Sequence, residues 1–399
     1  MDYNNQTREW DIDEHGIVFA LGSLYEYLRK IVDTRHAKGK RYALVTLLVV
    51  ILLAKLAGED KPSGICDWVA ERVVQLVEMK ILKRRQPPCH MTYRRVLQTI
   101  VPADELDRLL YEYHQQCLET EQEIVLTMDG KTLRGTIPRG ELRGTHILTV
   151  YAPRQGLVLV QAQVDQKENE IVVAPQVLRQ VNLQGAIVIG DAMHTQREAS
   201  SQIVAAGGDY VWFVKGNQAR TEWAIQKLFV HEMCNLRQGA ALGKDFQTHT
   251  QVSKQHGRLE TRTIYVSTLL NDYLNWPHVA QVFRLERVRW HPHYRNRTRE
   301  IVYGLTSLPP TRCSPERLLL LTQTYWGIEN GLHYRRDVTL HEDATRLTLG
   351  YAGRIMATIN NLVIGLCLRH HGPNVAKARR HFDACPEEAF QLLLAANQK

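Results

Sequence analysis

A mostly apolar run that ends in an acid constrains the fold of this chain more than any other stretch. Ile124 to Met128 form the run, and Asp129 and Gly130 follow it directly. A segment that is apolar on both faces is typical of a strand buried in the middle of a sheet. An acid at its end is held by rigid backbone and stays open to a ligand, as a catalytic or metal-binding carboxylate must be. An Asp-Gly pair between apolar segments also fits a hairpin turn, so this stretch alone leaves two interpretations.

A second segment of the same kind favours the first interpretation. Ala186 to Gly190 predicts another short buried strand, and Asp191 follows it. The surrounding pattern predicts a β-hairpin, two helices and a further strand, at 146–164, 170–181, 195–206 and 210–214. In a mixed sheet wound in this order, the first and fourth strands lie adjacent and parallel. Both acids then emerge at one end of the sheet, at a switch point where ligands bind.

The rest of the chain divides into helical and β-rich parts. Ala43 to Ala54 is strongly apolar but too short for a membrane-spanning helix, which needs about twenty residues, so it predicts a buried core helix. A helix with Ser63 as its N-cap is expected next, and Ser314-Pro315 predicts the start of a late helix. We expect four parts: a helical, DNA-binding N-terminal domain (1–104), the first part of an α/β core (105–216), a β-rich insertion (217–310), and the second part of the core with a glutamate-bearing helix and C-terminal helices (311–399).

The charge of the chain favours a polyanionic partner. Lys and Arg number 50 against 42 Asp and Glu, which gives a formal charge of +8. Basic residues cluster in three separate runs, Arg29–Arg41, Lys80–Arg95 and Arg284–Arg299. A single run of this kind is more often a solvated face, but three of them indicate several contacts to a nucleic-acid backbone.

The cysteines indicate a reducing compartment. The chain has seven, an odd number, and no Cys-x-x-Cys pair, which argues against a disulfide framework and a structural zinc site. We therefore expect a cytoplasmic protein with no membrane partner.

Three acids are the strongest candidates for chemistry. Asp129 and Asp191 at strand ends, with Glu329 on a helix, offer oxygen ligands for two divalent cations. Two such ions can activate the attacking oxygen and stabilise the leaving oxygen during phosphoryl transfer. Hard oxygen ligands favour Mg²⁺, with Mn²⁺ as a substitute. Spacing alone does not establish this set, and Asp337, Glu342 and Asp343 are rival third acids.

The motifs around these acids resemble one family. They are Asp129-Gly130-Lys131-Thr132-Leu133-Arg134-Gly135, Lys167-Glu168-Asn169-Glu170-Ile171, Asp191-Ala192-Met193-His194-Thr195-Gln196, Lys215-Gly216-Asn217-Gln218, His256-Gly257-Arg258-Leu259-Glu260, the segment Trp326 to Tyr334, and Asp337-Val338 followed by Glu342-Asp343. From about Arg35 to the C-terminal helix, the chain resembles the ISAs-type insertion-sequence transposases and H-repeat-associated proteins of the DDE transposase superfamily.

The resemblance implies a fold, a site and an activity. The fold is ribonuclease H-like, with the β-rich insertion between the last core strand and the glutamate helix, and the metal-binding catalytic triad is Asp129, Asp191 and Glu329. Family members cut DNA at the ends of their element and join the 3′-hydroxyls to target DNA. The resemblance also implies terminal inverted repeats as a DNA partner, a homodimer when assembled on DNA, and a nucleoid-associated protein of a bacterial-type cell.

One departure limits what is carried over. A related branch of these transposases places Tyr and Arg seven and four residues before the glutamate, where this chain has Thr322 and Tyr325. A basic residue seven positions after the glutamate is present as Arg336. The hairpin-intermediate mechanism of that branch is therefore not assigned to this chain.

Six further residues are candidates for contact with DNA: Lys131, Arg134, Lys215, Asn217, His333 and Arg336. Each has an ordinary structural alternative. A basic residue beside acids also balances charge, an asparagine also caps local backbone, and a helical histidine also packs. Gly130-Lys131-Thr132 superficially resembles a nucleotide-binding loop, but Val125 stands where that loop needs a glycine.

Two other functions remain open from the sequence. One is a metal-dependent nuclease of the same fold that cuts DNA without joining it. The other is a non-catalytic DNA-binding protein descended from a transposase. Intact acids at all three positions count against the second.

Overall fold

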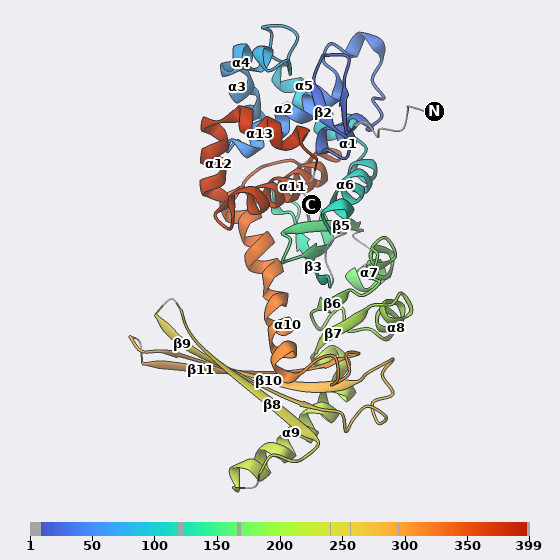
Figure 1. The fold of residues 1–399 in the computed structure, drawn as a ribbon, viewed down its shortest axis with the longest axis vertical. Coiled ribbons are helices and arrows are strands. Elements are labelled where there is room, and N and C mark those ends of the chain that lie inside the picture. Colours follow the sequence, from blue (N-terminus) through green and yellow to red (C-terminus); the bar gives the residue numbers. More distant parts are fainter. Residues whose placement is uncertain are drawn as a thin grey trace, which may run out of the picture. The chain divides into compact units, whose positions relative to one another are not determined.

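The computed structural model describes residues 9–118, 123–165, 169–239, 241–255, 257–293 and 295–396. The motif members Lys167, Glu168 and His256, and the first eight residues of the predicted N-terminal domain, lie outside these ranges. The chain forms two compact units, whose elements are labelled in Figure 1. The first unit comprises Met1–Glu121, Lys131–Gln166 and Glu329–Lys399, and the second comprises Gln122–Gly130 and Lys167–Ile328. The four-part division drawn from the sequence stays a prediction.

Three parallel strands form the centre of the second unit. They are β3 (Val125–Thr132), β6 (Ile187–Gly190) and β7 (Asp209–Val214). β3 pairs with β6 from Val125↔Ile187 to Met128↔Gly190, and β6 pairs with β7 from Ile187↔Asp209 to Gly190↔Trp212. All residues of β6 and β7 are buried, as strands covered on both faces must be. The predicted parallel pairing of the two acid-bearing strands is confirmed.

Two helices connect these strands. α7 (Glu170–Arg179) precedes β6, and α8 (Arg197–Ala205) lies between β6 and β7 and packs against α7. The succession of strand, hairpin, helix, strand, helix and strand is the one predicted. It agrees with the ribonuclease H-like fold that the resemblance implied.

The β-rich insertion is present and extends the same sheet. After α9 (Ala219–Arg237) come β8 (Phe246–Gln255), β9 (Arg258–Ser267), β10 (Gln281–His291) and β11 (Asn296–Thr306). β11 pairs antiparallel with β7, and the order continues β7-β11-β10-β9-β8. The end of β11 that pairs with β7 is buried, whereas its first six residues are exposed. The insertion therefore joins the core through one end of a long hairpin ladder.

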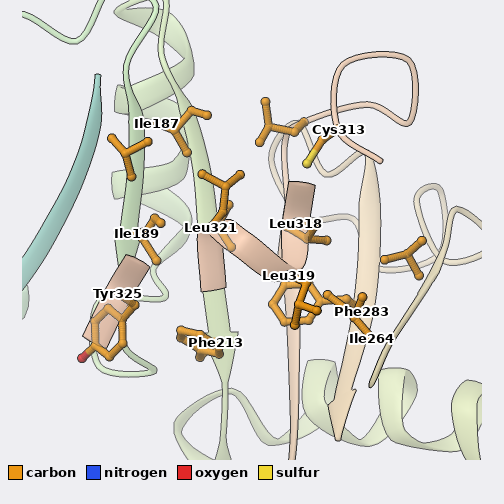
Figure 2. Close-up of a cluster of buried hydrophobic side chains, with 14 residues drawn as sticks. Ile187, Ile189, Phe213, Ile264, Phe283, Cys313, Leu318, Leu319, Leu321 and Tyr325 are labelled. Carbon is orange, nitrogen blue, oxygen red and sulfur yellow. The ribbon is translucent and has the colours of Figure 1, made fainter. Parts of the chain in front are cut away.

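A hydrophobic cluster fixes α10 (Pro315–Ile328) against this sheet (Figure 2). Leu318, Leu321 and Tyr325 of α10 belong to one buried cluster with Ile189 and Phe213 of the sheet, in which the rings of Tyr325 and Phe213 are in contact. Each large apolar side chain buried in this way stabilises the fold by about 1.5–3 kcal/mol.

The start of α10 is the predicted one, since Ser314 Oγ accepts from Arg317 N at 3.3 Å and Pro315 follows. α10 ends at Ile328, and Glu329 is the next residue.

The first unit is mainly helical. Its elements are β1 (Trp10–Ile12), β2 (Val18–Ala20), α1 (Leu24–Arg29), α2 (Leu44–Leu56), α3 (Pro62–Glu71), α4 (Val73–Glu78), α5 (His90–Arg95), α6 (Ala103–Leu118), β4 (His146–Ala152), β5 (Leu157–Val164), α11 (Ala352–His371), α12 (Val375–Ala384) and α13 (Pro386–Leu394). Strands β4 and β5 form the predicted antiparallel hairpin. The α/β class, with N-terminal helices, a mixed sheet and a β-rich insertion, is confirmed.

Helix α2 is the buried core helix expected from its composition. Every residue of α2 is buried, including Lys55, whose Nζ lies 3.1 Å from Asp60 Oδ1. Arg379 of α12 also contacts Asp60, at 2.7 Å, so the buried cation is paired within a network. The predicted N-cap of the next helix was wrong, because Lys61 occupies that position and Pro62 begins α3.

None of the helices in the described ranges is both long and apolar enough to cross a bilayer. All seven cysteines lie in the described ranges, and none of them forms a disulfide there.

Candidate active site

The two strand-end acids lie side by side at one edge of the second unit's sheet. Met128 and Gly190 are the last register pair of β3 and β6, and Asp129 and Asp191 are the residues that follow them. Paired strands are about 4.8 Å apart, so the two acids are close neighbours just beyond the shared register, although β3 itself continues to Thr132. Lys215 follows the end of β7, the third parallel strand, and is exposed. The expectation that both acids emerge at the same end is confirmed.

The turn interpretation of Asp129-Gly130 was wrong. Gly130 lies within β3, which continues to Thr132, and its φ is not positive. Its lack of a side chain has another cause, since a Cβ on Gly130 would overlap the carboxyl group of Glu170. Gly190 has a similar constraint, because a Cβ there would lie 2.6 Å from the ring of Trp212 and 3.0 Å from His194 Cβ. The two glycines therefore make room for side chains packed around the acids.

Asp191 is oriented by the backbone that follows it. Its Oδ1 accepts from Met193 N at 2.8 Å and from His194 N at 3.3 Å. Among the described residues, none donates to its Oδ2. A carboxylate with one oxygen fixed by amides and the other available is typical of a metal ligand with a preset orientation. Asp191 and Asp129 thus fit the hard oxygen donor set of a divalent cation.

The loop after Asp191 forms hydrogen bonds with β7 and with the turn that follows β7. Thr195 Oγ1 donates to Phe213 O at 2.6 Å, and Gln218 Nε2 donates to Thr195 O at 3.0 Å. The amide of Asn217 donates to the carbonyl of Ala192. For Asn217, these contacts favour the local backbone role over the alternative of contact with DNA.

Two residues near Asp129 were missed as site residues. His194 Nε2 lies 3.1 Å from Glu170 Oε2, and both side chains are buried. Asp129, Glu170 and His194 each offer one ligand atom, and these atoms lie within 4.8 Å of one another. Asn169 accepts from Val172 N and caps α7, which fixes Glu170 in its first turn. Both residues stood in the family motifs, but no spacing rule marks a glutamate or a histidine there as a ligand.

Glu329 is placed within the first unit. It begins a π-helical turn, Glu329–His333, directly after α10, and its carboxylate is half-exposed. Its Oε2 lies 3.8 Å from His333 Nδ1. Burial lowers the pKa of His333. Such turns are frequently found at functional sites.

The rival acids are paired with cations of the first unit. Lys131 Nζ lies 2.7 Å from Asp337 Oδ2, and Arg336 Nη2 lies 2.8 Å from Glu342 Oε2. Burial opposes ionisation of Glu342, but Arg336 beside it holds the pKa of that carboxyl below its ordinary value. Asp337, Glu342 and Asp343 are close enough to hold an ion, yet two of them are already neutralised.

Three of the basic residues proposed to contact DNA lie in the first unit, and they differ in burial and in ion pairing. Arg336 is fully buried and Lys131 is paired, which favours structural roles for both. Arg134 is largely exposed and lies 3.7 Å from Asp343.

Two of the three basic runs meet in the first unit. A cavity of about 660 Å³ lies between them, lined by Arg29, Lys40, Arg41, Lys83 and Arg84 together with Glu14 and Asp33. We call it the basic groove. Of its cations, Arg41, Lys83 and Arg84 are exposed and form no ion pair with described residues. Positive charge that is not neutralised within the protein is suited to phosphate groups.

The third basic run is largely neutralised on β10 and β11. Its arginines form a ladder of ion pairs with glutamates on the same and neighbouring strands: Arg284–Glu286 at 2.7 Å, Arg289–Glu260 at 2.9 Å, Arg299–Glu286 at 2.6 Å, and Arg287 with Glu300. This arrangement favours a solvent-exposed sheet face, whose charges are neutralised within the protein, over a surface that binds nucleic acid.

The packing of Gly130 against Glu170 gives a stability prediction. Gly130→Ala should lower the free energy of unfolding by about 1–3 kcal/mol, because the added methyl displaces a buried carboxyl group. Glu170→Ala removes that overlap, so the double variant should be destabilised by less than the sum of the two single effects in chemical denaturation. Gly216→Ala, in open space of the same unit, is the control. Strictly additive effects would contradict the packing.

The chain matches two family models and several known proteins. Residues 25–114 match the family described as "DDE_Tnp_1-associated", and residues 120–360 match "Transposase DDE domain". The chain is 28% identical to "Putative transposase YncI" of Escherichia coli O157:H7, over 87% of each chain. It is 26% identical to "H repeat-associated putative transposase YhhI" of Escherichia coli (strain K12), over 87% of this chain and 90% of the relative.

Among solved structures, the cryo-EM structure of the piggyBac transposase synaptic complex with hairpin DNA is similar at a TM-score of 0.45. The identity is 10%, over 94% of this chain and 80% of that one. The transposase-domain model matches more than half of the chain. This chain therefore belongs to the family of transposases with a DDE domain.

Proposed function

We propose that this protein is a metal-dependent DNA transposase that cuts phosphodiesters at the ends of its element and joins the freed 3′-hydroxyls to target DNA. The observation that carries the proposal is the pair Asp129 and Asp191, which follow the last register pair of two adjacent parallel strands in a chain of this family. Water would attack the phosphodiester at an element end first. The 3′-hydroxyl released in that step would then attack target DNA, and no covalent enzyme intermediate is needed.

Asp129, Asp191 and Glu329 would hold Mg²⁺, or Mn²⁺ in its place. Bound divalent ions supply activation of the attacking oxygen and charge stabilisation of the leaving oxygen. The hydrogen bonds from Met193 N and His194 N keep the Asp191 carboxylate in one orientation, which lowers the cost of organising the site. Glu329 enters the proposal through its motif and through its place at the end of the glutamate helix.

Lys215 is the basic residue best placed to bind a phosphate near the acids. It is exposed, and it follows the third of the three parallel strands whose ends carry Asp129 and Asp191. Its ammonium group would hold a non-bridging oxygen of the scissile or the adjacent phosphate. Arg134, exposed on the first unit, would bind the DNA backbone.

The basic groove would bind the DNA backbone. Transposition requires two element ends held together, so we propose a homodimer assembled on DNA, with terminal inverted repeats and target DNA as partners. A protein with this partner would be associated with the nucleoid in the cytoplasm.

Removing the first acid tests the chemistry. Asp129→Asn should reduce cleavage of terminal-repeat DNA by about a thousandfold or more, because the absence of one ligand removes several kcal/mol of transition-state stabilisation. Asp191→Asn and Glu329→Gln should do the same, while DNA binding in a gel-shift assay is retained. Asp343→Asn, which changes a rival acid, should leave cleavage near the wild-type rate.

The products separate the proposal from its rivals. Full activity of Asp129→Asn would overturn the assignment of the site. Cleavage without joined product, under conditions that supply target DNA, would identify a nuclease. Binding that is independent of Mg²⁺, with no cleavage by the wild-type protein, would identify a non-catalytic descendant.

Reversing two charges in the basic groove tests the binding surface. Lys83→Glu with Arg84→Glu should weaken DNA binding by about tenfold or more at moderate salt. The slope of log affinity against log salt should fall by about 0.9 for each phosphate that the protein no longer neutralises. Lys377→Glu with Arg380→Glu, exposed on α12 of the same unit, changes the net charge equally and is the control. Equal weakening in both double variants would contradict a role for the groove.

A further inference from the structure

His194 is a buried histidine whose ring nitrogens form no hydrogen bond with described residues, although Nε2 lies 3.1 Å from Glu170 Oε2. The residue is 1% exposed, and neither ring nitrogen has a hydrogen-bond partner among the described residues. An imidazole buried without such bonds costs free energy, and an ion or a water is the usual reason for an exception. The environment of His194 therefore points to a ligand.

The approach of His194 to Glu170 has the geometry of shared coordination. Nε2 and Oε2 are 3.1 Å apart, but the two groups are not aligned as a hydrogen bond. Two ligands at right angles around one ion, each about 2.1 Å from it, lie about 3 Å from each other. An oxygen of Asp129 lies within 4.8 Å of both atoms. The three groups converge as ligands of one small ion do.

The packing keeps this arrangement in place. Gly130 and Gly190 leave the space that Glu170 and His194 fill, and the capped start of α7 fixes the backbone of Glu170. The His194 backbone is held in turn by Asp191, whose carboxylate accepts from its amide. A rigid donor set of this kind loses little entropy when an ion binds.

A cavity of about 220 Å³ lies beside His194. It is lined by His194, by Ile171 and Pro175 of α7, and by Gln196 and Gln218. One water molecule occupies about 30 Å³ in the liquid, so several fit. Water in this cavity can complete the coordination of an ion, which three protein groups leave unfilled.

The donor set discriminates between metals. Mg²⁺ prefers oxygen ligands only, whereas imidazole suits transition metals and carboxylates suit Mn²⁺. We infer that Asp129, Glu170 and His194 bind one divalent transition-metal ion, of which Mn²⁺ is the representative, and that this ion shares Asp129 with the proposed catalytic site. The inference rests on the proposed function only through the role given there to Asp129.

The test is pulsed electron paramagnetic resonance of the full-length protein with one equivalent of Mn²⁺ and no DNA. The wild-type protein should show modulation from a directly bound imidazole nitrogen. His194→Asn should remove that modulation, whereas Asp191→Asn and His333→Gln should keep it. Melting temperatures of the variants check that each one is folded.

A second measurement does not depend on the histidine variant. Glu170→Gln, which preserves the size of the side chain, should weaken Mn²⁺ binding by about tenfold or more in calorimetry. Its Mg²⁺ affinity should change by a smaller factor, since Mg²⁺ is held mainly by the oxygens at the strand ends.

Three results would overturn the inference. They are Mn²⁺ bound to the wild-type protein without nitrogen modulation, modulation that survives His194→Asn, and modulation that disappears in His333→Gln alone. The failure of the proposed function gives a different pattern. A normal nitrogen signal with no DNA cleavage would contradict the transposase, whereas cleavage that depends on Asp129 without a nitrogen signal would contradict only this metal site.

Discussion

The parallel register of β3 on β6 is the constraint on which the candidate site depends. This pairing ends at Met128 and Gly190, so two acids that are far apart in the sequence become neighbours just beyond it. A shift of one residue in that register would turn one acid to the opposite face. The register is fixed because β6 is fully buried and paired on its other side with β7. The chemistry of the acids therefore relies on hydrophobic strands that carry no catalytic group themselves.

Small residues decide what surrounds the acids. Gly130 and Gly190 have no side chains because Glu170, His194 and Trp212 occupy the adjacent space. The buried carboxylate of Glu170 adds an oxygen donor next to the two acids, and the buried imidazole of His194 adds a nitrogen donor. The same edge of one sheet can thus differ in its preference among divalent ions through residues on the neighbouring helix and loop.

Much of the fold follows from the sequence, but less of the site. The buried runs before Asp129 and Asp191, the hairpin 146–164 and the all-buried helix α2 are predicted because burial on every side leaves an unbroken apolar pattern. The roles of Glu170 and His194 in the site are not predicted, since the residues that they contact come from distant segments. Lys131 and Arg336 were candidates for contact with DNA. Lys131 instead pairs with the distant residue Asp337, and Arg336 pairs with Glu342 in the protein interior. Local sequence reveals neither the long-range contact nor the burial.

The proposed activity depends on a divalent ion held by Asp129, Asp191 and Glu329. Fe²⁺ substituted for that ion, with peroxide and a reductant, generates radicals that cut the peptide chain next to its ligands. Mapping the fragments by mass spectrometry tests the claim directly. An ion held by the three acids should produce cuts near residues 129, 191 and 329 that excess Mg²⁺ suppresses. Cuts confined to 337–343, or to the His381, Cys385 and Glu388 group, would contradict it.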